Sequence, residues 1–512
     1  MAVTVFASVY IGSFEISLKI FEISQKNKMK EIDYVRAHLD LGKDAYQNGS
    51  IGYELVDNLC EILVEFKTIM DGYKVDSYEA YASAIMRDIS NEAFVLDQIQ
   101  LRTGFVIKVI SNSEHRFISY KSVAARKEFE EMIQTSAAVI DIGGASIQIT
   151  LFENGELITT QHMEVGTVRL RSILYKPGMS ENSYQKQLEE YLNKKFEVLR
   201  ALYFENGVDY IIFMNDHGLE LINRIEKDNK LDNLIKGDKF TRYLEKIQKK
   251  SLSDMIRELN IADERDTLMV PSLMLFKTLV LNLNASKVWI PGVDINDGIA
   301  FDYAERNCFV KAAHDFRADI ISAAKYMSAH YNSHSPHIEA LKVLSMKIFD
   351  TIRKQNGLTE RDKLLLEVSV ILHDCGKFVS LVNSAQCAYE IIMASEIIGL
   401  THLEREIVAL TILYNSTQLD LYEDLSDRID YDSYLKVAKL SAILRVANAL
   451  DQSHKQKFKN VKTSLKGREL IITLEAFEDI SLEKALFENK TAYFENVFSI
   501  KPVLKQKKIY DV

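Results

Sequence analysis

Apolar, β-branched and aromatic residues dominate residues 3–11 and 16–23, and the pair Gly12-Ser13 separates the two stretches. Runs of this kind, bounded by small turn residues, predict two strands joined by a tight turn. Apolar residues then recur at helical spacing over 53–69 and 92–103, before a short β-branched stretch at 105–110. The first part of the chain is therefore predicted to mix strands and helices.

A second strand–turn–strand unit follows in the same order. Residues 137–140 and 147–152 are apolar, and the segment between them (141–146, DIGGAS) is rich in small residues. Amphipathic helices are expected at 183–203 and 240–259, with buried strands at 208–213 and 287–290. Two such units in tandem predict a duplicated α/β domain.

The character of the sequence changes beyond Gly298. Residues 308–454 carry almost only helical periodicity, whereas 469–474 alternate and 492–501 are rich in aromatic residues, and we interpret both of the latter as strands. The predicted parts are a first α/β subdomain (1–132), a second (133–304), an all-α domain (305–460) and a small α+β region (461–512).

Composition restricts the class of protein. The 512 residues include 5 Pro and 20 Gly and are 47% hydrophobic and 27% charged, enough for two to four domains of about 100–200 residues. Scattered cysteines without CxxC spacing indicate neither a zinc ribbon nor a disulfide framework, and they favour a reducing compartment. The N-terminus lacks the basic segment of a signal peptide, and the most apolar stretch, 270–283, is shorter than the ~20 residues that span a bilayer. A soluble cytoplasmic protein without membrane contact is expected.

The charge balance bears on the partner. The chain has 63 basic and 73 acidic residues and a net charge of −10. This balance disfavours nucleic acid as a binding partner, because affinity for nucleic acid comes from neutralising its phosphates with Lys and Arg. A basic groove on an acidic protein still permits a polyanionic substrate.

The two glycine turns are the first candidates for chemistry. Glycine lets a phosphate approach backbone N–H groups closely, and neighbouring hydroxyls add donors. A lone glycine turn is more often a plain β-turn. Here two matching glycine turns begin the two halves of one α/β region. A phosphate site is then about as well supported as a plain β-turn, and both interpretations stay open.

Several motifs in a fixed order make the chain resemble the exopolyphosphatase and guanosine pentaphosphate phosphohydrolase (Ppx/GppA) family of the actin and sugar-kinase superfamily. Residues 9–13 (VYIGS) and 141–149 (DIGGASIQI) are similar to the family's two phosphate loops. Residues 83–91 (SAIMRDISN) resemble its S-A…R-x-x-x-N segment, and 109–114 (VISNSE) resemble V-I-S-G-x-E-E. Residues 166–170 (GTVRL) match a G-x-V-R-L strand, and 297–299 (DGI) match the closing acidic–Gly–aliphatic sequence.

This resemblance implies a fold and a reaction. The fold would be α/β, with duplicated actin/sugar-kinase-like (ribonuclease H-like) domains, then an all-α HD-like domain and a small α+β C-terminal region. The reaction would be Mg²⁺-dependent release of the terminal phosphate of inorganic polyphosphate, or of the 5′-phosphate of guanosine pentaphosphate, by a homodimer. The residues implied in phosphate binding are Gly12, Ser13, Arg87, Gly143, Gly144, Ala145 and Ser146.

Departures from the family pattern fall on acidic positions. Tyr10 replaces the Asp of the first loop, His115 replaces the usual catalytic Glu, and Gln148 replaces the acidic residue of the second loop. Gln does not hold Mg²⁺ as a carboxylate does, whereas a His titrates near neutral pH and suits a general base. The candidate catalytic residues are Glu114, His115, Asp141 and Gln148, and Asp141 is also the candidate Mg²⁺ ligand.

Two functions are consistent with this pattern. The first is an exopolyphosphatase-like hydrolase in which Glu114 or His115 activates water. The second is a catalytically impaired member that binds polyphosphate or a guanosine alarmone as a sensor or regulator, which the loss of carboxylates favours.

The helical half contains a second constellation. The order H…HD…D resembles the metal-dependent HD phosphohydrolases, in which two His and two Asp bind a divalent metal that activates water. Gln386 and Asn415 occupy intermediate His positions, which argues against a binuclear centre. The alternative is that these groups only hydrogen-bond between helices. The candidate ligands of a single divalent metal are His337, His373, Asp374 and Asp451.

Overall fold

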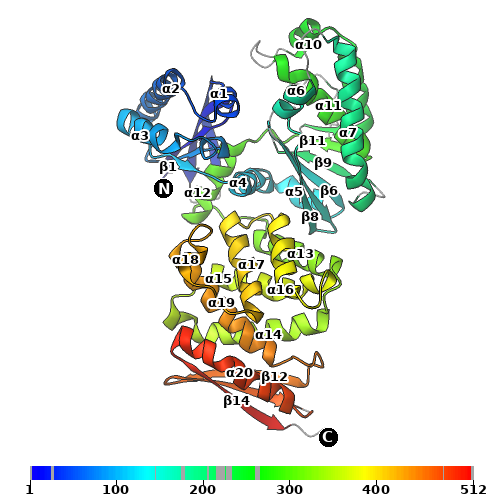
Figure 1. Cartoon of the computed structure of the whole chain (residues 1–512). Helices are drawn as coiled ribbons and strands as arrows, with labels where there is room; N and C mark the ends of the chain where they lie inside the picture. The colour runs from blue at the N-terminus through cyan, green and yellow to red at the C-terminus, as the bar shows by residue number, and fades with distance from the viewer. Residues whose placement is uncertain are drawn as a thin grey trace. The chain divides into compact units, whose positions relative to one another are not determined.

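The computed structural model describes residues 3–24, 28–144, 146–174, 179–203, 207–214, 225, 233–259, 266–476 and 478–508. The chain forms two compact units, Met1–Asp315 and Phe316–Val512 (Figure 1). None of the described helices is both long and apolar enough to cross a membrane.

The first sheet has the strand order β3-β2-β1-β4-β5. An antiparallel meander is extended by two parallel strands, and the five strands are β1 (Val3–Ile11), β2 (Glu15–Ser24), β3 (Lys28–His38), β4 (Ser77–Ala82) and β5 (Lys108–Val109). Because side chains alternate along a strand, β1 serves two cores. Val9 and Ile11 pack with Leu59 and Leu63 of helix α2 (Tyr53–Gly72), whereas Phe6 packs with Ile299 of helix α12 (Ile295–Arg306).

The second sheet repeats this plan with one strand more. Its order is β10-β11-β9-β6-β7-β8: an antiparallel meander is again extended by two parallel strands, and β10 is added antiparallel at the edge. The strands are β6 (Ser136–Ile142), β7 (Ile147–Glu153), β8 (Glu156–Met163), β9 (Tyr210–Phe213), β10 (Leu234–Lys236) and β11 (Lys287–Trp289). Two mixed sheets that share a five-stranded plan therefore form the first unit, in agreement with the predicted duplication.

The helices of the first unit cover these sheets. They are α1 (Leu41–Asn48), α2 (Tyr53–Gly72), η1 (Ala84–Met86), α3 (Glu92–Thr103), α4 (Asn112–Ala124), α5 (Lys127–Ile133), α6 (Thr167–Leu174), α7 (Glu181–Tyr203), α9 (Gly237–Gln248), α10 (Leu252–Leu259), α11 (Asp266–Asn282) and α12 (Ile295–Arg306).

Helix α4 contacts elements from both halves of this unit. Tyr120 stacks on Phe152 of the second sheet, with ring centroids 6.1 Å apart. On its other side α4 packs against α12, where a Cβ on Gly298 would lie 2.0 Å from the Ile118 carbonyl oxygen. Only glycine permits this close approach of the two helices, which positions α4 against the first sheet.

A buried polar network joins α12 to the first sheet. Asn296 accepts a hydrogen bond from Ser8 at 2.9 Å and donates one to Ser17 at 2.8 Å. The buried Lys19 ammonium lies 2.8 Å from Asp297. The chain thus returns to its first sheet after completing the second, and the boundary predicted near residue 305 falls within this helix.

The second unit begins with helices and ends with a small sheet. The helical elements are α13 (Phe316–His330), α14 (Ser335–Ile352), η4 (Arg353–Asn356), α15 (Glu360–Leu372), η5 (Cys375–Phe378), α16 (Ser384–Ala394), α17 (His402–Ser416), α18 (Tyr422–Leu425) and α19 (Tyr431–Ala449). Strands β12 (Phe458–Lys466), β13 (Glu469–Ala476) and β14 (Lys501–Lys508) pair in that order, and α20 (Ser481–Phe498) packs on α19 and β14.

Three local predictions from the sequence are wrong. Residues 492–501 lie mostly in α20, because Phe487, Phe494 and Phe498 fall at helical spacing and are buried on one side of it. The expected strand at 166–170 is the start of α6, whose first N–H groups bond to carbonyls of the second glycine turn. The single helix expected at 240–259 is two helices, α9 and α10.

Candidate functional site

The first glycine turn is closed by its own backbone. The Gly12 N–H donates to the Glu15 carbonyl at 2.9 Å, and a Cβ on Gly12 would lie 2.8 Å from that oxygen. The Ser13 carbonyl accepts a hydrogen bond from the Gly42 N–H at 2.7 Å, which ties the turn to the start of α1. Glycine is required here because the turn leaves no room for a side chain.

The second turn has the same closure. The Gly143 N–H donates to the Ser146 carbonyl at 2.9 Å, and the Gly143 and Gly144 carbonyls accept from N–H groups at the start of α6. Ala145 lies outside the described residues. Because the amides of Gly12 and Gly143 close their turns, phosphate donors at the hairpins would have to come from neighbouring groups such as the hydroxyls of Ser13 and Ser146.

Glu114 holds the start of α4. Its carboxylate accepts from the Ser111 N–H at 2.9 Å, its own N–H donates to Ser111 Oγ, and Lys108 Nζ lies 3.3 Å away. Burial alone would raise the pKa of Glu114, but these hydrogen bonds and the Lys108 charge outweigh it and lower the pKa. A capping carboxylate with a lowered pKa is a poor general base at neutral pH.

His115, the next residue, faces the end of β1. Its ring centroid lies 5.5 Å from that of Tyr10. Burial lowers the pKa of His115, and the negative charge of Asp141 opposes this shift in part. Burial also raises the pKa of Tyr10 above its ordinary value, and Asp141 adds to that rise. At neutral pH His115 is therefore neutral and able to accept a proton, while Tyr10 keeps its hydroxyl hydrogen.

Asp141 is the first residue of a polar row across the second sheet. The strand register places Asp141 opposite Gln148, and Gln148 opposite His162. Directly opposite residues have neighbouring side chains on one face of a sheet. Gln148 is buried, and its side-chain amide lies 3.5 Å from Thr150 Oγ1.

The first sheet has the equivalent row. Tyr10 lies opposite Ser17, and Ser17 opposite Arg36. Tyr10 and Asp141 each precede the glycine of their hairpin by two residues, so they are corresponding positions of the duplicated topology.

Arg116 was not singled out from the sequence, yet the structure buries it at this site. Its side chain lies 3.2 Å from the Ser146 hydroxyl of the second hairpin and 2.5 Å from His162 Nδ1. The sequence feature that could have identified Arg116 is its position directly after His115, on the same turn of α4. Arg87, the predicted phosphate ligand, has a 49% exposed side chain that lies 3.8 Å from Asp88.

The donor set fits Mg²⁺ poorly. Mg²⁺ prefers carboxylate and other oxygen ligands in octahedral geometry. Among the site residues just described, Asp141 supplies a carboxylate, Gln148 supplies only a neutral amide oxygen, and Tyr10 stays protonated. The Arg116 cation beside Ser146 further disfavours a protein-bound Mg²⁺.

The second unit brings together all four candidate metal ligands of the helical half. His337 Nδ1 lies 2.8 Å from Asp451 Oδ2, and His373 Nε2 lies 3.2 Å from Asp374 Oδ1. The imidazole rings of His337 and His373 are 5.2 Å apart. Burial lowers the pKa of His373 to about 4.

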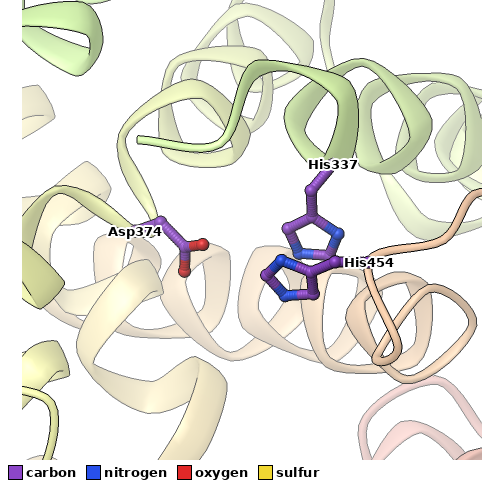
Figure 2. A group of neighbouring side chains, drawn as sticks. All are labelled: His337, Asp374 and His454. Carbon is purple, nitrogen blue, oxygen red and sulfur yellow. The ribbon is translucent and has the colours of Figure 1, made fainter. Parts of the chain in front are cut away.

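His454 joins this cluster, although the sequence reasoning missed it. Its ring stacks on that of His337, with centroids 3.7 Å apart and an interplanar angle of 10°. Figure 2 shows both imidazoles turned toward the region of Asp374. One potential ligand atom from each of His337, Asp374 and His454 lies within 4.8 Å of the other two. The sequence feature that could have identified His454 is its short spacing from Asp451, since both residues lie in the turn after α19.

Comparison with known proteins identifies the family. Residues 20–307 match the sequence model of the Ppx/GppA phosphatase family, and residues 321–492 match that of Ppx/GppA phosphatase, domain III. The crystal structure of the Aquifex aeolicus Ppx/GppA family member is 17% identical, with a TM-score of 0.50 over 61% of this chain and 100% of that chain. An exopolyphosphatase from Cytophaga hutchinsonii is 17% identical, with a TM-score of 0.51 over the same shares. The matched part of the chain shares its fold with these structures. The chain belongs to the Ppx/GppA phosphatase family.

Proposed function

We propose that the chain binds the terminal phosphates of inorganic polyphosphate at the two glycine hairpins and hydrolyses the last phosphoanhydride bond. The observation that carries this proposal is the position of α4. It brings His115 against Tyr10 and within electrostatic reach of Asp141, while Arg116 contacts Ser146 of the second hairpin. A base and a cation therefore lie on one helical turn beside a hairpin.

The binding groups suit a terminal phosphate. Arg116 presents a guanidinium near Ser146, and guanidinium–phosphate hydrogen bonds are among the stronger ones in proteins. The hydroxyls of Ser13 and Ser146 supply further donors at the two turns. The protonated Tyr10 hydroxyl is available for one more hydrogen bond to the same anion.

The chemistry needs one proton acceptor. His115 accepts a proton from a water molecule whose oxygen attacks the terminal phosphorus. The bond from that phosphorus to the bridging oxygen breaks, and its electron pair leaves with the shortened chain. Asp141 stabilises the imidazolium that forms on His115, since opposite charges attract strongly at a site of reduced water access. The products are inorganic phosphate and a chain shorter by one unit.

Mg²⁺ dependence has to be explained without a carboxylate cluster. Because the residues around Asp141 do not form one, we propose that any Mg²⁺ in the reaction is carried by the polyphosphate as its counterion. The affinity for polyphosphate would then depend less on Mg²⁺ than that of a site with a protein-held metal. The 5′-phosphate of guanosine pentaphosphate is a second possible substrate, because it is also a terminal phosphate on an anhydride.

A second candidate function is binding without turnover, as a sensor of polyphosphate or of a guanosine alarmone. Gln148 and Tyr10 favour it, since neither side chain supplies the negative charge that would hold a catalytic metal. Arg116 is compatible with both candidates, because it would bind the anion whether or not cleavage follows.

One experiment separates the two candidates. The purified full-length chain is incubated with long-chain polyphosphate or guanosine pentaphosphate, with Mg²⁺ or EDTA, and released phosphate is measured beside calorimetric binding. Release that falls in His115→Gln, but not in a His330→Gln variant changed at an exposed histidine of the second unit, supports hydrolysis. Binding without release supports the sensor. The absence of both with either substrate refutes both functions.

A further inference from the structure

The histidine cluster of the second unit contains two imidazole nitrogens with no hydrogen-bond partner among the described residues. His337 is fully buried, and its Nδ1 lies 2.8 Å from Asp451 Oδ2. Asp451 also accepts hydrogen bonds from the Gln456 backbone and side chain, at 2.8 Å and 3.1 Å. Because a carboxylate accepts, His337 donates through Nδ1 and its Nε2 carries a lone pair. That Nε2 has no hydrogen-bond partner among the described residues.

His373 is held in the same way by a different acceptor. Its Nδ1 lies 2.7 Å from the Val370 carbonyl oxygen, so Nδ1 donates and Nε2 again carries a lone pair. This Nε2 has no hydrogen-bond partner within the described part of the chain, and it lies 3.2 Å from Asp374 Oδ1. Two acceptors facing each other at this distance repel unless a proton or a cation lies between them.

His454 adds a third imidazole to this cluster. It sits in the turn after α19 with a φ of 55°, a left-handed conformation uncommon for residues other than glycine. This backbone places its ring on that of His337, at 3.7 Å. Figure 2 shows the two rings and the Asp374 carboxylate around a common space, and the ligand atoms lie within 4.8 Å of one another.

We propose that His337, Asp374 and His454 bind one divalent transition metal, with His373 as a fourth ligand and Asp451 as the residue that orients His337. Imidazole nitrogens outnumber carboxylate oxygens, which suits zinc, iron, cobalt or nickel rather than magnesium, calcium or manganese. Metal–ligand bonds of about 2.0–2.2 Å imply ligand–ligand separations of roughly 3.5 Å in a tetrahedral site. Since the donor atoms lie within 4.8 Å of one another, they need to close by at most about 1.3 Å, within the reach of side-chain rotation.

Fixed tautomers are a further reason for this assignment. A ligating histidine usually donates its other ring N–H to a carboxylate or a backbone carbonyl, which orients the ring and raises its basicity. His337 and His373 both have such a partner, in Asp451 and in Val370. This proposal concerns residues of the second unit and does not depend on the proposed function of the hairpins.

Lys377 is the competing cation. Its Nζ lies 2.8 Å from Asp374 Oδ2, and its side chain is 41% exposed. An ammonium beside the metal carboxylate weakens metal binding by repulsion. Removing it without losing its aliphatic length, as in Lys377→Met, should therefore tighten metal binding, whereas a purely structural cluster would show no such gain.

The test is a metal titration of the full-length chain after chelation. Co²⁺ and Zn²⁺ are titrated by calorimetry, Co²⁺ is also followed by its visible absorption, and bound metal is measured by elemental analysis. We expect one site per chain, a loss of about 100-fold or more in affinity in His454→Ala, and a loss of about 10–100-fold in Asp451→Asn. The matched control is His330→Ala, which removes an exposed histidine at the end of α13.

His337 is buried, so its own variants are less informative than those of the partly exposed His454 and Lys377. Circular dichroism and thermal melting of His454→Ala and Lys377→Met check that the second unit remains folded in both variants. Equal Co²⁺ affinity in the wild type, His454→Ala and His330→Ala would overturn the proposal. A second outcome would also overturn it: Co²⁺ binds with one ion per chain, Lys377→Met leaves the Co²⁺ affinity unchanged, and the bound Co²⁺ shows no absorption typical of imidazole ligands.

Discussion

The imidazole of His115 and the phenol of Tyr10 lie with ring centroids 5.5 Å apart, although they come from α4 and β1. The family resemblance predicts acidic residues at both positions, and the two replacements therefore meet in one site. The charge of Asp141 shifts the pKa of each ring upward, against burial in His115 and together with burial in Tyr10.

The first prediction concerns the pH dependence of phosphate release. A general base acts only when unprotonated, so the rate should rise as the pH passes above the pKa of His115. Because the pKa of His115 is lowered, the midpoint of the acidic limb of the pH–rate profile should lie below the ordinary histidine pKa of about 6.5. Asp141→Asn removes the charge that opposes the lowering and should move the limb to still lower pH. A limb above the ordinary value would contradict His115 as the base.

The second prediction separates Glu114 from His115. Glu114→Gln removes a capping carboxylate and should reduce the free energy of unfolding by about 1 kcal/mol. It should leave the pH profile of phosphate release unchanged. His115→Gln should instead lower the rate by about 10²–10⁴-fold with little effect on stability. Steady-state kinetics and urea unfolding of both variants provide the check, and the reverse pattern would assign the base to Glu114.

The third prediction concerns the lost carboxylates. The combined variant Tyr10→Asp, His115→Glu and Gln148→Glu restores acidic side chains at the three departures and should create an Mg²⁺ site. We expect Mg²⁺-dependent phosphate release at least about tenfold above that of the wild type, within the range of a positioned acid–base group. As a control, a Gln161→Glu variant adds a negative charge on β8, next to His162 at the end of the polar row, and should give no gain in phosphate release. Unchanged activity in a folded, polyphosphate-binding triple variant would count against this interpretation.

The fourth prediction tests the packing that positions α4. Gly298→Ala places a Cβ 2.0 Å from the Ile118 carbonyl oxygen, so α12 and α4 must move apart. Overpacking of this kind costs about 1–3 kcal/mol of unfolding free energy. Gly72→Ala is the matched control, because Gly72 ends α2 with nothing within 4 Å of the added Cβ. Thermal melts should show destabilisation only in Gly298→Ala, and phosphate release should fall with it.

Much of the fold was determined by local patterns in the sequence. The alternation around Gly12 and around Gly143 predicted both hairpins, because a period of two and a small turn residue are local properties. The helical half was predicted for the same reason, from its period of 3.6. The errors at 166–170 and 492–501 have the opposite cause, since short apolar stretches suit strand and helix alike until packing decides between them.

The site itself depends on contacts between residues far apart in the sequence. Motif order pointed to Asp141 and His115, but only packing shows that α4 carries His115 to Tyr10 and directs Arg116 to Ser146. Likewise His337 comes from α14, Asp374 from the turn after α15 and His454 from the turn after α19. The left-handed backbone of His454 has no signature in residue spacing. Sequence by itself determines which elements form, because secondary structure follows local periodicity. Tertiary structure decides which side chains meet, because that depends on how the elements pack.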